Sequence, residues 1–104
     1  MRVIADLAIV PLGAGVSLSR YVAAVEKVLR EANLNATLHA NGTNVEGEWD
    51  DVFSALKRCH EVLHQMGVPR VSTNLRCSTR TDRDQSMAGK IAAVERWLHD
   101  GQDS

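Results

Sequence analysis

The stretch Asn41-Gly42-Thr43-Asn44-Val45-Glu46-Gly47 decides the fold, because it joins two strand-like segments through a tight turn and places an acid just beyond that turn. In residues 34–40, which precede it, Leu and Ala alternate with polar residues, as in a half-buried strand. Asn-Gly is the strongest short signal for a β-hairpin, since both central residues of a type I′ turn need positive φ. The sequence therefore predicts a hairpin whose second strand spans residues 43–48.

An amphipathic helix is predicted on each side of this hairpin. Before it, apolar residues recur at helical spacing between Leu18 and Ala32, and Ser17 is the predicted N-terminal cap. After it, residues 50–66 have an inward-facing apolar stripe, and Gly67 follows as a residue suited to ending a helix.

Two further strands and a third helix complete the chain. Residues 3–10 form a strand that is apolar on both faces and ends at Pro11, and residues 70–79 form a strand with one polar face. The third helix follows a charged loop and directs four apolar residues inward, namely Met87, Ile91, Val94 and Leu98. The predicted order is strand, helix, strand, strand, helix, strand, helix.

This order predicts an α+β protein with a ferredoxin-like βαββαβ sandwich and an extra C-terminal helix. In its antiparallel four-stranded sheet the fourth and first strands are adjacent, followed by the third and then the second. The two long helices cover one face. The other face carries Ile4, Ala8 and Val10 of the first strand, which is too apolar for free exposure, so we expect a partner subunit or the third helix to cover it.

Length and composition limit the functional classes. The 104 residues are expected to form one domain, residues 1–104. A net charge of -1 argues against nucleic acid and anionic membranes as partners, and no apolar run is long enough to span a bilayer. Cys59 and Cys77 are predicted inside a helix and a strand, so we expect reduced core thiols in a cytoplasmic protein.

Polar side chains converge on the open face of the predicted sheet. If Val45 points to the core, period-two alternation sends Glu46 to the open face, together with Asp6, Asn74 and Arg76. A buried carboxylate is costly unless it is paired or bound to a ligand. One interpretation is a pocket at a subunit interface, where Glu46 accepts from a cationic or amino-bearing ligand. The other, which spacing alone favours, is a structural Glu46–Arg76 ion pair on a wet surface.

Other patterns that could carry chemistry are weak. Gly13-Ala14-Gly15 lacks the third glycine of a dinucleotide fingerprint and the lysine of a P-loop. His60 and His64 lie one helical turn apart, but no third ligand accompanies them, so no metal site is predicted. No arrangement of Ser, Cys and His indicates a nucleophile, which weighs against an enzyme and predicts no catalytic residue.

Four segments together resemble the small thiamine-binding protein family. They are residues 17–22, residues 41–47, Met66-Gly67-Val68-Pro69-Arg70-Val71, and Arg80-Thr81-Asp82 followed by Ser86-Met87 and Lys90. The Gly-Thr-x-x-Glu-Gly and Arg-x-Asp pieces are the most specific, and the resemblance covers almost the whole chain. The sequence departs from the family pattern at Asn41, where methionine is expected, and at Cys77-Ser78-Thr79, where a more charged run is expected.

The resemblance implies a ferredoxin-like homotetramer, built as a dimer of dimers, that binds thiamine or its hydroxymethylpyrimidine half without catalysis and requires no cofactor. Carried over by position, the candidate ligand-binding residues are Ser17, Thr43 and Glu46, with Tyr21 beside them. An aminopyrimidine offers a ring nitrogen and an amino group that a carboxylate and a hydroxyl can satisfy together. Glu46 is therefore the predicted anchor, and Thr43 is its support.

The resemblance also implies that Arg80 and Asp82 either bind ligand or hold the oligomer together. An alternative function is a structural or regulatory oligomer that responds to an anion or to a partner protein. An enzyme acting on a small metabolite is a third hypothesis, which the missing nucleophile and metal site disfavour.

Overall fold

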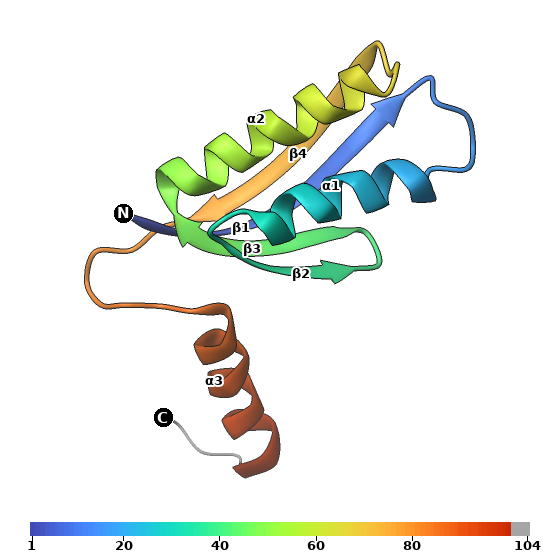
Figure 1. The fold of residues 1–104 in the computed structure, drawn as a ribbon. Coiled ribbons are helices and arrows are strands. Elements are labelled where there is room, and N and C mark those ends of the chain that lie inside the picture. Colours follow the sequence, from blue (N-terminus) through green and yellow to red (C-terminus); the bar gives the residue numbers. More distant parts are fainter. Residues whose placement is uncertain (101–104) are drawn as a thin grey trace.

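The computed structural model describes residues 1–100 of the chain (Figure 1). Its helices and strands follow the predicted order: β1 (Arg2–Leu12), α1 (Ser19–Glu31), β2 (Asn35–His39), β3 (Gly42–Glu48), α2 (Trp49–Gln65), β4 (Arg70–Ser78) and α3 (Met87–Asp100).

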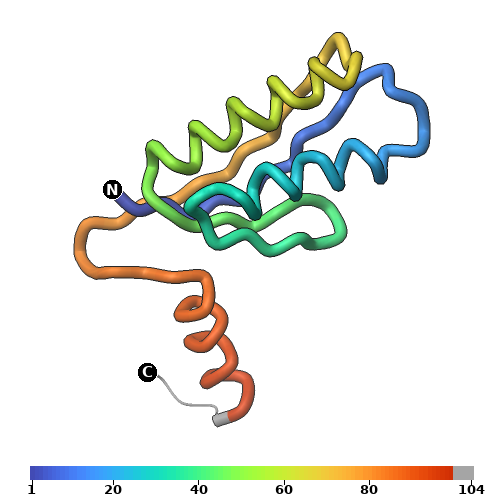
Figure 2. Tube along the Cα trace, in the orientation of Figure 1, coloured from blue at the N-terminus to red at the C-terminus, as the bar shows by residue number. Residues whose placement is uncertain are grey.

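The four strands form one antiparallel sheet in the order β2-β3-β1-β4. Helices α1 and α2 pack against each other over one face of this sheet (Figure 1, Figure 2). The predicted ferredoxin-like α+β fold, with its strand order and C-terminal extra helix, is therefore confirmed.

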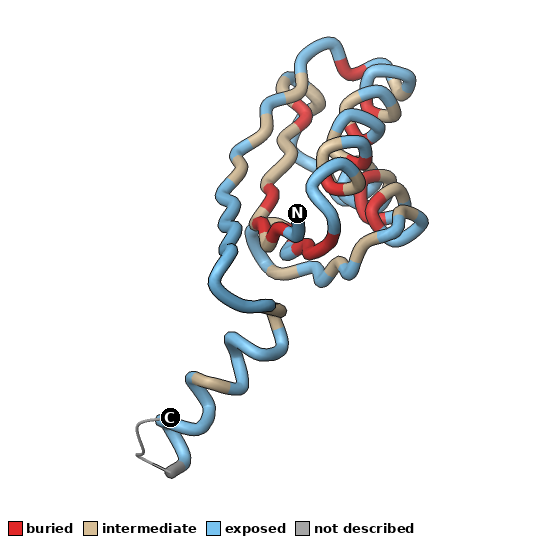
Figure 3. Tube along the Cα trace, turned by 90° about the vertical axis from the view of Figure 1, so that its left-hand side faces the viewer, coloured by how far each residue is buried: buried red, intermediate tan, exposed pale blue. Residues whose placement is uncertain are grey.

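The core fills the layer between the sheet and the two long helices (Figure 3). Every second residue of β1 and β3 points toward the helices, as the period of a strand requires. The buried apolar residues are Val3, Ala5, Leu7, Val25, Leu29, Val45, Val52, Ala55, Cys59, Leu63 and Val68. The intervening residues of both strands lie on the open face.

The hairpin is confirmed, but its turn is not of type I′. His39 pairs with Gly42, which leaves Ala40 and Asn41 as the loop. Among residues 1–100 no non-glycine residue has positive φ, and Gly42 is not one of the positive-φ glycines. Gly42 is required for another reason, since a Cβ there would lie 2.5 Å from the carbonyl oxygen of Leu7. The Asn41 N–H donates to Nδ1 of His39 at 3.2 Å and closes the turn.

Pro11 does not end β1, because the strand continues beyond it and pairs Pro11 with Val71 of β4. β3 pairs only with residues Arg2–Leu7, so the last part of β1 has no strand on its other side within residues 1–100. The Leu7 carbonyl points toward β3, as its closeness to Gly42 indicates. Backbone groups alternate along a strand, so Pro11 shares this direction, and its missing N–H removes no sheet hydrogen bond.

The first helix starts later than predicted. It begins at Ser19, and the residue before it, Leu18, makes no side-chain cap hydrogen bond. Ser17 is exposed in the preceding loop, so its assignment as the cap is wrong. The predicted end of α2 is correct, because Gly67 follows it with φ of 93°.

Helix α3 does not turn its apolar residues inward, which corrects the prediction. Ile91, Val94 and Leu98 are 61%, 58% and 72% exposed. The helix projects from the rest of the molecule (Figure 1, Figure 3), which gives the whole structure an elongated shape of 51 × 28 × 20 Å along its principal axes. Helical periodicity reveals an apolar stripe but not the surface that it packs against. The first residue of α3, Met87, contacts the open face at Glu46.

Cys77 is exposed, whereas Cys59 is buried in the core. The prediction of a core thiol is therefore wrong for Cys77. It lies near the end of β4, which is an edge strand of the sheet and is covered on fewer sides than β1. Both cysteines are free thiols.

Candidate functional site

The polar residues predicted on the open face do lie there. Asp6 pairs with Arg76 and the neighbouring Ala8 pairs with Asn74 across β1 and β4, while Glu46 lies on β3 opposite Ile4. Alternation along the strands thus places the four polar residues as expected. They do not form one cluster, because β1 separates Glu46 from the two residues of β4.

Glu46 uses both carboxylate oxygens within the chain. Its Oε1 accepts from the side-chain amide of Asn35 at 2.8 Å, and its Oε2 accepts from the main-chain N–H of Met87 at 2.9 Å. It is therefore buried by the start of α3 rather than by an ion pair with Arg76. A carboxylate at a helix N-terminus is favourable, and this contact attaches α3 to the sheet.

Asp6 is also engaged, since its Oδ1 lies 2.7 Å from Nε2 of His39. This pair reaches across Gly42, which has no side chain to block it. Asp6 and His39 together extend from β1 to β2 on the open face.

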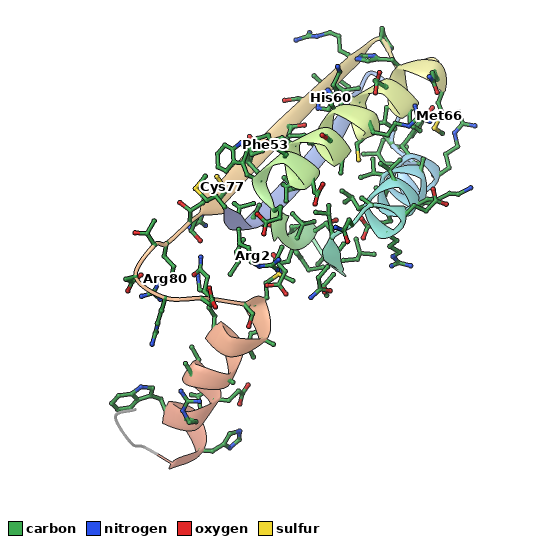
Figure 4. All side chains as sticks on the ribbon, turned by 60° about the vertical axis from the view of Figure 1, so that its left-hand side comes forward. Arg2, Phe53, His60, Met66, Cys77 and Arg80 are labelled. Atoms are coloured by element: carbon green, nitrogen blue, oxygen red, sulfur yellow. The ribbon has the colours of Figure 1, made fainter. Side chains whose placement is uncertain are left out.

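Three other predicted residues, Tyr21, Arg80 and Asp82, have partners close by in the sequence. The Tyr21 hydroxyl accepts from Arg20 at 3.0 Å, and the guanidinium of Arg20 lies 4.7 Å from the centre of the Tyr21 ring. Arg80 donates to both carboxylate oxygens of Asp82, at 2.7 and 2.5 Å, and this hydrogen bonding lowers the pKa of Asp82 to about 2. Figure 4 shows Arg80 on the linker between β4 and α3, away from the two long helices. Ser17 and Tyr21 do not meet Glu46.

Thr43 lies on the face of the sheet opposite to Glu46, because three positions along a strand reverse the direction of the side chain. The predicted support of Glu46 by Thr43 is therefore wrong. Thr43 is buried, and its hydroxyl donates to Oε2 of Glu26 on α1 at 3.0 Å.

Glu26 is a buried acid that was not among the residues predicted to bind ligand. It is only 6% exposed, and its Oε1 has no hydrogen-bond partner among residues 1–100. Buried polar atoms are nearly always paired, so an unpaired carboxylate oxygen is costly. A signal was present in the sequence, since Glu26 lies four residues after Val22 and three before Leu29, within the apolar stripe of α1.

Glu26 and Thr43 line a recess of about 960 Å³ beside the hairpin. The recess exists because β3 stops pairing with β1 at Leu7. This leaves a gap beside the last part of β1, and α1 covers that gap. Its walls are mainly apolar and include Leu7, Ala8, Ile9, Val10, Pro11, Leu18, Val22, Val25, Leu29 and Leu38, while Lys27, Arg30, Glu31 and His39 are charged or polar lining residues. Of the predicted ligand-binding residues, Thr43 lines this recess.

Glu26 and Thr43 are polar residues in the mainly apolar lining of the recess, and a buried acceptor beside such a lining suits a planar ligand that donates an N–H. Nothing in it resembles an activated nucleophile. Burial, followed by the negative charge of Glu26, raises the pKa of the nearby Cys59 thiol to about 12, so this thiol stays protonated at neutral pH.

The two histidines of α2 have separate partners. His60 Nε2 lies 2.6 Å from the Thr73 hydroxyl, and His64 Nδ1 lies 2.8 Å from the Val68 carbonyl oxygen. In the part of the chain that the structure describes, no three His, Cys, Asp or Glu side chains are grouped so that they could hold a metal ion.

Comparison with known proteins identifies the family. A family model described as thiamine-binding protein matches residues 5–95. The chain belongs to the thiamine-binding protein family. A UPF0045 protein of Synechocystis is 57% identical over 98 residues, which cover 94% of this chain and 81% of that protein. The UPF0045 protein ECM15 of Eremothecium gossypii is 41% identical over 101 residues, covering 96% of both chains.

Solved structures share the fold of this chain. The crystal structure of hypothetical protein MJ1052 from Methanocaldococcus jannaschii has a TM-score of 0.84 and 32% identity, and the match covers 90% of this chain and 96% of that one. A Thermotoga maritima protein whose suggested role is thiamine biosynthesis or salvage has a TM-score of 0.77. At 16% identity, with 90% of this chain and 99% of that one covered, the second match shows the fold alone. Within residues 1–100, no helix has the length and apolarity needed to cross a membrane.

Proposed function

We propose that this protein binds thiamine or its hydroxymethylpyrimidine half without transforming it, and that the recess between α1 and the hairpin is the binding site. The observation that carries the proposal is the unpaired Oε1 of Glu26, a buried acceptor at an apolar recess. Membership of the thiamine-binding protein family supports this class of ligand. Glu26 thus replaces Glu46 as the anchor.

The chemistry of the recess suits an aminopyrimidine. The amino group of the ligand donates to the unpaired oxygen of Glu26, while Thr43 holds the other oxygen. Apolar side chains such as Val22 and Ile9 provide contact area for the ring faces. A ligand that satisfies the buried acceptor removes an energetic penalty, which makes recognition selective for N–H donors.

Self-association is part of the proposal, as a homotetramer built from a dimer of dimers. Two separate apolar surfaces support it: the exposed side of α3, and the open face of the sheet around Ile4. Ala8, Val10 and His39 belong to this open face and also line the recess, so a subunit that covers the face would border the binding site. A cytoplasmic location, where both free thiols stay reduced, completes the proposal.

Calorimetric titration with matched variants tests the site. Thiamine and hydroxymethylpyrimidine should bind the native protein, and oxythiamine, in which a carbonyl replaces the amino group, should bind weakly. Glu26→Gln should lower the affinity by about tenfold or more, since one hydrogen bond to a charged group is lost. Glu46→Gln is the control and should leave affinity unchanged. Binding that depends on Glu46 but not on Glu26 would contradict the proposal.

A second candidate function is an oligomer that responds to an anion. A hollow of about 670 Å³ between the linker and α3 is lined by Arg80, Arg83, Lys90 and Arg96 together with one acid, Asp84, and Arg80 also binds Asp82. Such a concentration of cationic groups suits a sulfate or phosphate. A mass measurement in solution with and without phosphate tests this candidate, because an anion-responsive oligomer would change its assembly state.

A further inference from the structure

The wall of the recess opposite α1 is the edge of a strand. β1 is paired on both sides up to Leu7, and from Ala8 onward the sheet pairs it only with β4 within residues 1–100. Ile9 and Pro11, which lie in this part of β1, line the recess. The recess therefore borders main-chain groups as well as side chains.

The direction of these main-chain groups follows from two contacts. The carbonyl oxygen of Leu7 faces β3, where it would lie 2.5 Å from a Cβ on Gly42, and the carbonyl oxygen of Met1 accepts from the Trp49 N–H at the same side of β1. Successive residues of a strand point their N–H and C=O groups to alternate sides. Ile9, two residues beyond Leu7, therefore directs one donor and one acceptor toward the recess.

An open strand edge is normally a liability, and proteins cover or block it. Here Pro11 has no N–H to offer, so Ile9 is the only residue of this edge with both a donor and an acceptor on the recess side. Helix α1 roofs the same gap. A one-residue edge beneath a helix is too short for an added peptide strand, but it matches the hydrogen-bonding edge of a small ring.

We infer that the recess recognises its ligand through the main chain of Ile9 together with Glu26. The class of ligand is a planar heterocycle with an amino group next to a ring nitrogen. The ring nitrogen accepts from the Ile9 N–H, one amino hydrogen goes to the Ile9 carbonyl oxygen, and the second goes to Oε1 of Glu26. This inference rests on the proposed function and deepens it, since the pyrimidine half of thiamine has this edge and its thiazolium half does not.

Amide hydrogen exchange of the 15N-labelled protein tests the inference, with hydroxymethylpyrimidine as the probe. Without ligand, the Ile9 amide should exchange rapidly, because no strand protects it. At saturation its exchange should slow by about tenfold or more, as expected for an amide that gains a hydrogen bond. The amides of Ala8 and Val10, which face β4, serve as internal controls and should not change. An analogue with C–H in place of the ring nitrogen beside the amino group should bind less tightly and leave Ile9 unprotected.

The outcomes separate this inference from the proposed function. If hydroxymethylpyrimidine binds in a Glu26-dependent manner while the Ile9 amide is unaffected, the proposed function stands and the inference is overturned. Slow exchange of Ile9 in the ligand-free protein would also overturn it, because another segment or a second copy would then occupy the edge. If no pyrimidine binds, both fail.

Discussion

The hydrogen bond between Thr43 and Glu26 gives a prediction that separates stability from binding. Thr43→Val keeps the branched shape but removes the donor to Oε2 of Glu26, which is 3.0 Å away. Both oxygens of a buried carboxylate then lack a partner. Loss of a hydrogen bond to a charged group should lower the free energy of unfolding by about 1.5–3 kcal/mol. Thr37→Val, at an exposed position of β2, is the matched control and should change it by less than about 0.5 kcal/mol.

The double variant Glu26→Leu/Thr43→Val sharpens this prediction. Replacing both members of a buried polar pair with apolar groups is often neutral or stabilising, and here it also removes the unpaired Oε1. We expect the double variant to be at least as stable as the native protein in urea unfolding, although it no longer binds ligand. The protein concentration is kept constant, because assembly shifts apparent stability. If the double variant were less stable than Thr43→Val alone, Glu26 would have a structural role and the reasoning would fail.

Three further predictions concern the turn, the linker and α3. Gly42→Ala should destabilise the protein by about 2 kcal/mol or more in urea unfolding, because its Cβ would overlap a backbone carbonyl of β1, whereas Gly13→Ala meets no atom and suffers only from its positive φ. The pKa of Asp82 should be about 2 by carbon-detected NMR titration and should rise toward its ordinary value in Arg80→Gln. Any stabilisation from this lowered carboxyl pKa is present above the unfolded pKa and is lost as the pH falls toward 2. An ordinary pKa for Asp82 in the native protein would contradict the prediction. Val94→Glu, on the exposed side of α3, should reduce the mass in solution if α3 mediates assembly, and an unchanged mass would exclude that role.

Local patterns in the sequence were sufficient to predict most of the fold. The alternation on either side of Asn41-Gly42 located the hairpin, and Gly67 marked the end of α2. The type of the turn could not be predicted from the sequence, because Gly42 is needed for the close approach of β1 rather than for a positive φ of its own. Pro11 was wrongly predicted to end β1 for a related reason. Only the pairing of the whole sheet shows that the missing N–H of Pro11 lies on the unpaired side of the strand.

The candidate site was harder to predict, because it depends on which elements face each other. Alternation correctly sent Glu46 to the open face, but it did not reveal that Asn35 and the start of α3 would each occupy one of its oxygens. Glu26 looked like one of several charged residues of an amphipathic helix, although its spacing from Val22 and Leu29 placed it on the apolar side. The recess itself arises from the different lengths of β1 and the hairpin, which a pattern read along one segment does not contain.

A crystal structure of the protein with hydroxymethylpyrimidine tests the central claim most directly. The account predicts that the amino nitrogen of the ligand lies about 2.7–3.2 Å from Oε1 of Glu26, within the recess that α1 roofs. A ligand bound instead on the open face beside Glu46, with Oε1 of Glu26 still unpaired, would contradict it.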